Sequence, residues 1–307
     1  MKEIDNVTII GMGALGTLFA YEIQEKIGRG KVAFLMDRKR YEKNSQAVYK
    51  VNGTPIDFRI LTPENASPAS LIIVAVKATG LMEALDTMAP AVGPDTIIIS
   101  AVNGVVSEDI LAERFGADKV IHAVAQGMDA AFFNHSLTFR NPGTFCLGIL
   151  DPAMQEKLDI LADFFRRISF PHSLEMDIRR RIWSKFMLNV GVNQVCMVLE
   201  TGYGGISAEG SLPRALMVSA MREAMLAAEA EGVHLTEQDL EGYVSLMASL
   251  SPDSMPSMAQ DRINRKRSEV ELFAGTVRRI AAEHGFLVPV NDYLYEMVQK
   301  IEAEYPI

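Results

Sequence analysis

The feature that most constrains this chain is a glycine-rich loop near its start, Gly11-Met12-Gly13-Ala14-Leu15-Gly16. An apolar run at 7–10 precedes the loop, and a helical pattern follows it to about residue 27. In such a strand–loop–helix unit the first glycine permits a tight turn, the second lets a pyrophosphate approach the backbone, and the third lets the helix pack close to the strand. The helix N-terminus then favours phosphate. The loop therefore predicts a dinucleotide-binding unit rather than a glycine-rich turn without a ligand.

Further apolar runs continue this pattern and lie at 32–36, 71–76, 96–100 and 120–124. Strands that are apolar on both faces are typical of parallel sheets covered by helices on both sides. Because strands alternate with helical segments, the sheet should be doubly wound. We therefore expect an α/β fold that begins with a Rossmann-type doubly wound sheet.

The pattern changes after about residue 130. A hairpin is predicted at 137–147 around Asn141-Pro142-Gly143, followed by one helix at 154–168. From about residue 177 only helical patterns remain, and they lie at 178–200, 213–231, 236–250, 257–284 and 291–304. We predict two domains, a dinucleotide-binding Rossmann domain at 1–176 and an all-helical substrate and catalytic domain at 177–307.

Composition excludes several other classes of protein. The net charge of −9 argues against a nucleic-acid or anionic-membrane partner, although a small anionic substrate would feel only local charges. The two cysteines and five histidines show no disulfide framework and no metal-ligand spacing, so no metal is expected. No run has membrane-spanning length and the N-terminus lacks a signal-peptide apolar region, so we expect a cytoplasmic protein.

A polar stripe interrupts an otherwise apolar helical segment at 183–193. Lys185, Asn189 and Asn193 are four residues apart, so they fall on one face of a helix. Since the neighbouring residues are typical of a core, this face should border a partly enclosed site, where a lysine can have a lowered pKa and donate a proton. The alternative is a solvated stripe with a snorkelling lysine, and the pattern alone does not separate the two.

Two other segments carry polar residues of interest. Asn103-Gly104 follows the fourth predicted strand, where a simple turn is common but where open α/β sheets also bind ligands. Ser257 and Gln260 have the spacing of a capping box at the start of the predicted 257–284 helix. Glu269 lies about three turns further along that predicted helix and by itself fits a surface charge.

Taken together, these motifs resemble the ketopantoate reductase (2-dehydropantoate 2-reductase) family over essentially the whole chain. Each motif alone is weak, and the combination is specific. The matching segments are the glycine loop 11–16, Lys77, Asn103-Gly104, Asn141-Pro142-Gly143 to Gly148, Trp183-x-Lys185-x-x-x-Asn189-x-x-x-Asn193, and Ser257-Met258-x-Gln260-Asp261 with Glu269.

The resemblance implies hydride transfer from NAD(P)H to the 2-oxo group of ketopantoate, which gives pantoate for pantothenate and coenzyme A synthesis. Lys185 would protonate the carbonyl oxygen as hydride arrives, and Glu269 would bind the substrate hydroxyl. A cationic donor suits this step because negative charge builds on that oxygen. Substrate-positioning residues would be Asn103, Asn189, Asn193 and Ser257. Cofactor-binding residues would be Gly11, Met12, Gly13, Ala14, Leu15, Gly16, Lys77 and Asn103.

Asp37 leaves the choice of cofactor open. It lies 21 residues after Gly16, where an acidic residue is placed to bind the ribose 2′-hydroxyl of NAD(H). The family often has arginine there for the 2′-phosphate of NADP(H), which a carboxylate would repel. Arg38-Lys39-Arg40 follows directly and could offset Asp37, with Arg38 nearest. Asp37 favours NAD(H), whereas the family resemblance favours NADP(H).

Other functions remain open at this point. The family usually has glutamine before the Asn-Gly pair, where this chain has Val102. A 2-hydroxyacid dehydrogenase of the same architecture, acting on another branched 2-oxo acid, is therefore an alternative. A catalytically inactive NAD(P)-binding sensor is a second alternative. A sensor would need the glycine loop but would not need Lys185 and Glu269 together, so their joint presence favours an enzyme. The sequence leaves the oligomeric state undetermined, with a homodimer among the options.

Overall fold

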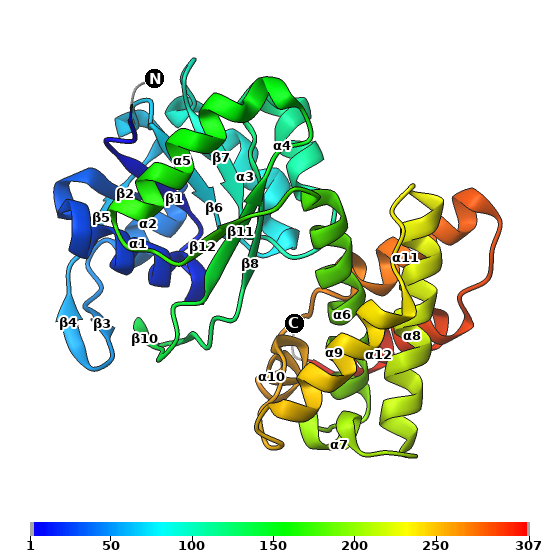
Figure 1. Ribbon diagram of the computed structural model, residues 1–307. Helices are drawn as coiled ribbons and strands as arrows, with labels where there is room; N and C mark the ends of the chain where they lie inside the picture. The colour runs from blue at the N-terminus through cyan, green and yellow to red at the C-terminus, as the bar shows by residue number, and fades with distance from the viewer. Residues whose placement is uncertain (1–2, 306–307) are drawn as a thin grey trace. The chain divides into compact units, whose positions relative to one another are not determined.

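The computed structural model describes residues 3–305 of a chain that divides into two compact units, Met1–Ile178 and Arg179–Ile307. The first unit combines strands and helices (Figure 1). In the second unit every regular element within the described residues is helical. This confirms the predicted fold class, a Rossmann-type sheet followed by a helical region. None of the described helices combines the length and apolar character needed to cross a membrane.

The main sheet of the first unit has five parallel strands in the order β5-β2-β1-β6-β7. Their bounds are β1 Val7–Ile10, β2 Val32–Leu35, β5 Arg59–Leu61, β6 Leu71–Val74 and β7 Ile97–Ser100. The order runs outward from β1 in both directions, so the topological switch point lies between β1 and β6. Ligands of open α/β sheets bind beyond the carboxyl ends of the strands at such a point.

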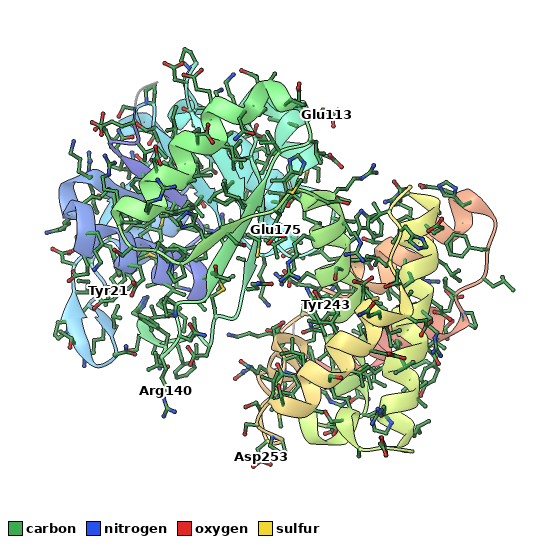
Figure 2. The ribbon with its side chains drawn as sticks, in the orientation of Figure 1. Tyr21, Glu113, Arg140, Glu175, Tyr243 and Asp253 are labelled. Carbon is green, nitrogen blue, oxygen red and sulfur yellow. The ribbon has the colours of Figure 1, made fainter. Side chains whose placement is uncertain are left out.

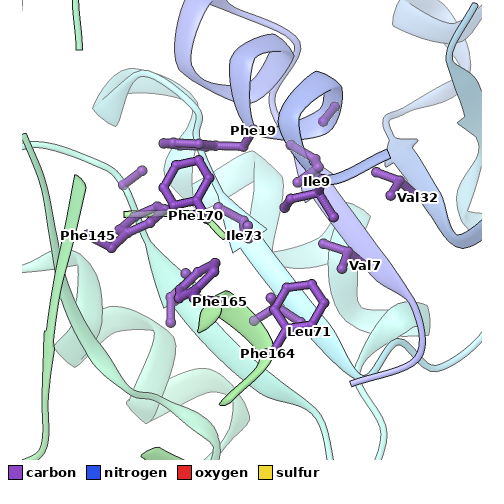
Figure 3. Close-up of a cluster of buried hydrophobic side chains, with 14 of the residues drawn as sticks. Val7, Ile9, Phe19, Val32, Leu71, Ile73, Phe145, Phe164, Phe165 and Phe170 are labelled. Carbon is purple, nitrogen blue, oxygen red and sulfur yellow. The ribbon is translucent and has the colours of Figure 1, made fainter. Parts of the chain in front are cut away.

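Helices cover this sheet on both faces, which explains why its strands are apolar throughout. Their bounds are α1 Ala14–Ile27, α2 Arg38–Asn44, α3 Leu81–Met88, α4 Ser107–Phe115 and α5 Gln155–Arg167. Neighbouring residues of β1 point to opposite faces. Ile9 belongs to a core with Phe19 and Phe165, and Ile10 belongs to a second core with Leu85. Figure 3 shows the first of these cores, where Phe145 and Phe165 stack at 5.5 Å between ring centroids.

The predicted fifth parallel strand is wrong in its pairing. The Ile121 N–H still donates to the Ile98 carbonyl at 3.0 Å, but the chain then leaves the parallel sheet. Strand β8 (His122–Gln126) pairs antiparallel with β11 (Thr144–Gly148). The third strand of this smaller sheet is β12 (His172–Leu174), parallel to β11. An apolar run does not reveal which partner satisfies its backbone.

The predicted hairpin at 137–147 is also wrong. Its first half is β10 (Ser136–Thr138), which pairs with β9 (Ala131–Phe133) and with β3 (Tyr49–Val51) in a sheet that ends at β4 (Thr54–Ile56). Its second half is β11, in a different sheet. The turn itself exists, because the Asn141 Oδ1 accepts from the Gly143 N–H at 3.0 Å and Gly143 has φ +71°. It joins two sheets instead of two paired strands.

The second unit consists of α6 Ile178–Val198, α7 Tyr203–Ser207, α8 Leu212–Ala230, α9 Glu237–Ser249, α10 Ser257–Ile263, α11 Ala274–His284 and α12 Pro289–Ala303. Thr236 and Asp239 form a reciprocal capping box that starts α9. Gly191 allows α6 to lie against α8, because a Cβ there would be 2.9 Å from the Met217 carbonyl oxygen. Helix α6 is thus a central element, and most of its side chains are buried.

Candidate active site

The three glycines of the loop differ in what surrounds them. A Cβ on Gly11, which has φ +106°, would lie 2.6 Å from the Ala75 carbonyl oxygen, and a Cβ on Gly16 would lie 1.9 Å from the Gly11 carbonyl oxygen. A Cβ on Gly13 would meet no atom within 4 Å. Two of the glycines are therefore required by packing, whereas Gly13 leaves space in front of α1. This space is a cradle that suits a pyrophosphate.

Gly13 also caps α1, without a side-chain hydrogen bond to the first turn. The backbone N–H groups of that turn can therefore donate hydrogen bonds to an anion. The side chains of Met12 and Leu15 are half-buried and pack on the core. We expect residues 11–16 to act on a cofactor through their backbone, and not through those two side chains.

A pair of alanine variants separates these two functions of the loop. We expect Gly13→Ala to keep the wild-type melting temperature but to weaken dinucleotide binding about tenfold, because the new methyl group occupies the cradle. Gly16→Ala should instead lower the unfolding free energy by about 2 kcal/mol or more, because its Cβ meets backbone. Thermal unfolding and calorimetric titration with NAD⁺ and NADP⁺ measure both effects. Unchanged binding by Gly13→Ala would contradict the assignment.

Lys77 and Asn103 follow neighbouring strands of the main sheet. Lys77 comes after β6 and precedes a short 3₁₀ turn, and its side chain is exposed. Asn103 comes after β7 and is half-buried. Because β6 lies between β1 and β7, both residues follow carboxyl ends on the same side of the glycine loop. Cofactor contacts are expected at this edge of the sheet.

Asp37 has a structural function that its position alone did not reveal. It is the N-cap of α2, and its Oδ1 accepts from the Arg40 N–H at 2.9 Å. Its Oδ2 pairs with the Arg40 guanidinium, also at 2.9 Å. Burial alone would raise the pKa of Asp37, but the hydrogen bonds and charge of Arg40 outweigh it and leave that pKa below its ordinary value. Arg38, the first residue of α2, is exposed.

In the second unit, the residues of the predicted polar stripe lie around the buried side-chain amide of Asn193. Asn193 Oδ1 accepts from the Ser257 hydroxyl at 3.0 Å and from the Met258 N–H at 3.3 Å. Asn193 Nδ2 then donates to Asn189 Oδ1 at 3.4 Å. Lys185 lies one turn before Asn189 on α6 and is half-buried. The structure therefore brings together Asn189, Asn193 and Ser257 on the face of α6 that carries Lys185.

The capping box predicted for Ser257 and Gln260 is wrong. The N-cap of α10 is Pro256, and no side chain caps this helix. The Ser257 hydroxyl bonds to Asn193 instead, and Gln260 Nε2 donates to the Met255 carbonyl at 3.0 Å. The serine thus joins α10 to α6, which is a function in tertiary structure that the local spacing did not show.

Glu269 does not lie on the same helix as Ser257, contrary to the sequence prediction. Helix α10 ends at Ile263, and Arg265 has φ +49°, which breaks the helix. Glu269 then precedes a single 3₁₀ turn and is half-buried. Its neighbour Ser268 is buried and donates to Glu302 of α12 from its N–H at 2.7 Å and from its hydroxyl at 2.5 Å. Glu302 therefore anchors the backbone next to Glu269.

A buried polar network that the sequence analysis missed connects four helices of this unit. Gln194, beside Asn193, accepts from the Ala274 N–H and donates to Asn291, each at 3.2 Å. Glu223 of α8 accepts from the Val290 and Asn291 N–H groups at 2.9 and 2.8 Å. Gln194 thus joins the starts of α11 and α12 to α6, and Glu223 joins the start of α12 to α8. The signal in the sequence was a glutamine and a glutamate within apolar helical segments.

Glu108, at the start of α4, is another buried carboxylic acid that was not anticipated from the sequence. It is 5 % exposed and accepts from the Ser107 hydroxyl at 2.6 Å. Burial raises the pKa of Glu108 from 4.5 to about 7, although hydrogen bonds from Ser107 and from backbone N–H groups oppose the rise. The folded state therefore holds this proton more tightly than the unfolded state does. The resulting stability is complete below about pH 4.5 and is lost as the pH rises through about 7.

We expect Glu108→Gln to remove this pH dependence. Between pH 5 and pH 8 the unfolding free energy of the wild type should fall relative to that of the variant, by up to about 3 kcal/mol. Urea unfolding at both pH values measures the difference. Glu113→Gln, on the exposed side of the same helix (Figure 2), is the matched control and should follow the wild type. Parallel pH profiles for wild type and Glu108→Gln would contradict the prediction.

No group of three or more His, Cys, Asp or Glu side chains that could hold a metal ion occurs within residues 3–305. The functional groups of the chain fall into two sets, one in each unit. The first unit has a glycine loop with open space at Gly13, and polar residues at the carboxyl ends of its strands. The second unit has a lysine, two asparagines and a serine on or against one helix, with a glutamate on an anchored loop.

Comparisons with known proteins concern the family and the fold of the chain. Family models described as "Ketopantoate reductase PanE/ApbA" and "Ketopantoate reductase PanE/ApbA C terminal" match residues 7–138 and 177–302. A 2-dehydropantoate 2-reductase from Vibrio cholerae is 23% identical over 301 residues, which covers 98% of this chain and 99% of that relative.

Two solved structures share the fold. D-mandelate dehydrogenase, in a ternary structure with NADH and anilino(oxo)acetate, superposes with a TM-score of 0.87 at 20% identity and covers 97% of this chain and 98% of its own. A PanE/ApbA family ketopantoate reductase from Ralstonia eutropha JMP134 has a TM-score of 0.82 at 23% identity and covers 97% and 99%. At these identities the likeness concerns the fold of the chain.

Proposed function

This chain belongs to the ketopantoate reductase family of oxidoreductases, and on that premise we propose that it reduces the 2-oxo group of ketopantoate to give pantoate. The observation that carries the proposal is the cluster around Asn193, which holds Ser257 and Asn189 on the face of α6 that also bears Lys185. A polar cluster of this kind, set in an apolar helix, has the donors that a small 2-oxo acid requires.

We assign cofactor binding to the first domain and proton transfer to the second. A nicotinamide cofactor supplies the hydride when it is bound. Lys185 Nζ donates a proton to the carbonyl oxygen, where negative charge develops. Because Asn193 Oδ1 already accepts two hydrogen bonds, its NH₂ group is directed at Asn189 Oδ1. The NH₂ group of Asn189 is then the donor oriented for a substrate oxygen.

Glu269 binds the substrate hydroxyl in this proposal, and Asn103 positions the substrate beside the cofactor. The test is the oxidation of reduced cofactor, followed by absorbance, with ketopantoate and a panel of branched 2-oxo acids. We expect the highest kcat/KM for ketopantoate. A higher value for another branched 2-oxo acid would favour the second candidate, a 2-hydroxyacid dehydrogenase, which the likeness to D-mandelate dehydrogenase supports. Dinucleotide binding without any reduction would indicate a sensor.

We propose NADH as the preferred cofactor. The pKa of Asp37 lies below its ordinary value, so the side chain is a carboxylate at neutral pH, and its negative charge opposes a 2′-phosphate. Asp37→Asn is the sharpest variant, because asparagine also caps helices well and so preserves the start of α2. We expect a higher kcat/KM with NADH in the wild type and a shift toward NADPH in the variant, by about tenfold. A strong wild-type preference for NADPH would show that the basic residues 38–40 bind the 2′-phosphate of the cofactor.

A further inference from the structure

Glu83 is a charged residue of the first domain that belongs neither to the glycine loop nor to the polar stripe of α6. It lies in the first turn of α3, the helix that follows β6. Its Oε2 accepts from Arg40 Nη2 at 2.9 Å, while Arg40 Nη1 donates to Asp37 Oδ2 at 2.9 Å. One guanidinium group therefore joins two carboxylates that come from different helices. We call these three residues, Asp37, Arg40 and Glu83, the carboxylate bridge.

The position of the carboxylate bridge follows from the strand order. Asp37 comes after β2 and Glu83 comes after β6, and these two strands flank β1, whose carboxyl end leads into the glycine loop. The bridge therefore spans the carboxyl edge of the sheet on both sides of β1. In a dinucleotide-binding sheet, the adenosine half of the cofactor lies in the crevice at this edge.

The carboxylate bridge also determines which acceptors the guanidinium of Arg40 can bind. An arginine next to the ribose normally recognises a 2′-phosphate through parallel N–H donors on its guanidinium. In this chain the two terminal nitrogens of Arg40 each donate to a carboxylate. Counting the three charges, the bridge carries a net charge of about −1, which opposes a phosphate dianion and is compatible with a ribose hydroxyl.

We propose that Glu83 is a determinant of cofactor choice, because it holds Arg40 in the carboxylate bridge and so favours NADH over NADPH. Asp37 alone holds Nη1 of the guanidinium and leaves Nη2 able to turn toward a 2′-phosphate. Glu83 holds Nη2. This inference rests on the proposed function only in that the cofactor is a nicotinamide dinucleotide, and it does not depend on which 2-oxo acid is reduced.

The experiment is calorimetric titration of the full chain with NAD⁺ and with NADP⁺, in the absence of any 2-oxo acid. We expect Glu83→Gln to raise the affinity for NADP⁺ relative to NAD⁺ by about tenfold, since a released arginine gains charge-assisted hydrogen bonds to the phosphate. The variant should keep the wild-type melting temperature, because the Glu83 side chain is 58% exposed. Asp86→Asn is the matched control on the same helix, since Asp86 pairs with Arg114 and should leave the ratio unchanged.

A second background tests whether Glu83 acts through Arg40. In Arg40→Gln, the further change Glu83→Gln should leave the NADP⁺ to NAD⁺ affinity ratio unchanged. An equal gain in both backgrounds, no gain in either, or a wild type that binds NADP⁺ more tightly than NAD⁺ would each overturn the proposal. Because binding is measured without substrate, a failure to reduce ketopantoate would be a separate result and would leave this one interpretable.

Discussion

Replacing Lys185 with alanine is expected to lower kcat about a hundredfold or more, the usual effect of losing a positioned acid. The reason is that the oxygen of the 2-oxo group gains negative charge as hydride arrives, and Lys185 is the cation on the polar face of α6. Dinucleotide affinity should change little, because the glycine loop and Asp37 belong to the other domain. Steady-state kinetics with ketopantoate, combined with calorimetric titration of the cofactor, measures both quantities.

The pH dependence distinguishes a proton donor from a residue that only supports the helix. Loss of the acid should remove the alkaline limb of the kcat/KM profile, whereas a structural change would scale the whole profile. Lys300→Ala, an exposed lysine on α12, is the matched control and should behave as the wild type. Near-normal kcat for Lys185→Ala would show that another group protonates the oxygen.

The parts of the fold that sequence predicted correctly are those in which local pattern and tertiary structure agree. The loop at 11–16 needs glycine because a strand, a tight turn and a helix follow one another there without a break. The structure shows the same need, since a Cβ on Gly11 or Gly16 would meet backbone atoms. The spacing of Lys185, Asn189 and Asn193 places them on one face of any helix. The structure added the partners of that face, namely Ser257 and the Met258 N–H.

The errors arose where a side chain or a strand had a distant partner. Ser257 has the local spacing of a cap, but Asn193, 64 residues away, offers a buried acceptor, and the hydroxyl bonds there. Strand β11 has an apolar pattern that suits a hairpin, yet β8 and β12 satisfy its backbone on both sides. The same reason explains why Glu302 and Glu223 were missed. Each is an isolated acid in a helix whose acceptor function exists only after the helices pack.

The second large effect concerns Glu269 and the substrate hydroxyl. We expect the wild type to prefer ketopantoate over 2-oxoisovalerate, which lacks that hydroxyl, by about a hundredfold or more in kcat/KM. The physical reason is that the analogue has no hydroxyl to donate to the Glu269 carboxylate, so a hydrogen bond to a charged group is lost from the transition state. The two hydrogen bonds from Ser268 to Glu302 fix the backbone beside Glu269, so the segment that carries the carboxylate is held in place.

Glu269→Ala provides the decisive comparison, because it should weaken the reaction of ketopantoate while leaving that of 2-oxoisovalerate nearly unchanged or improved. The preference should then fall to within about tenfold, since only packing against the extra group remains. Glu296→Ala, which removes an exposed carboxylate from α12, is the control and should retain the full preference. A wild type that reduces both acids equally well would place the chain among dehydrogenases of general branched 2-oxo acids. A preference that survives in Glu269→Ala would instead show that a different residue recognises the hydroxyl.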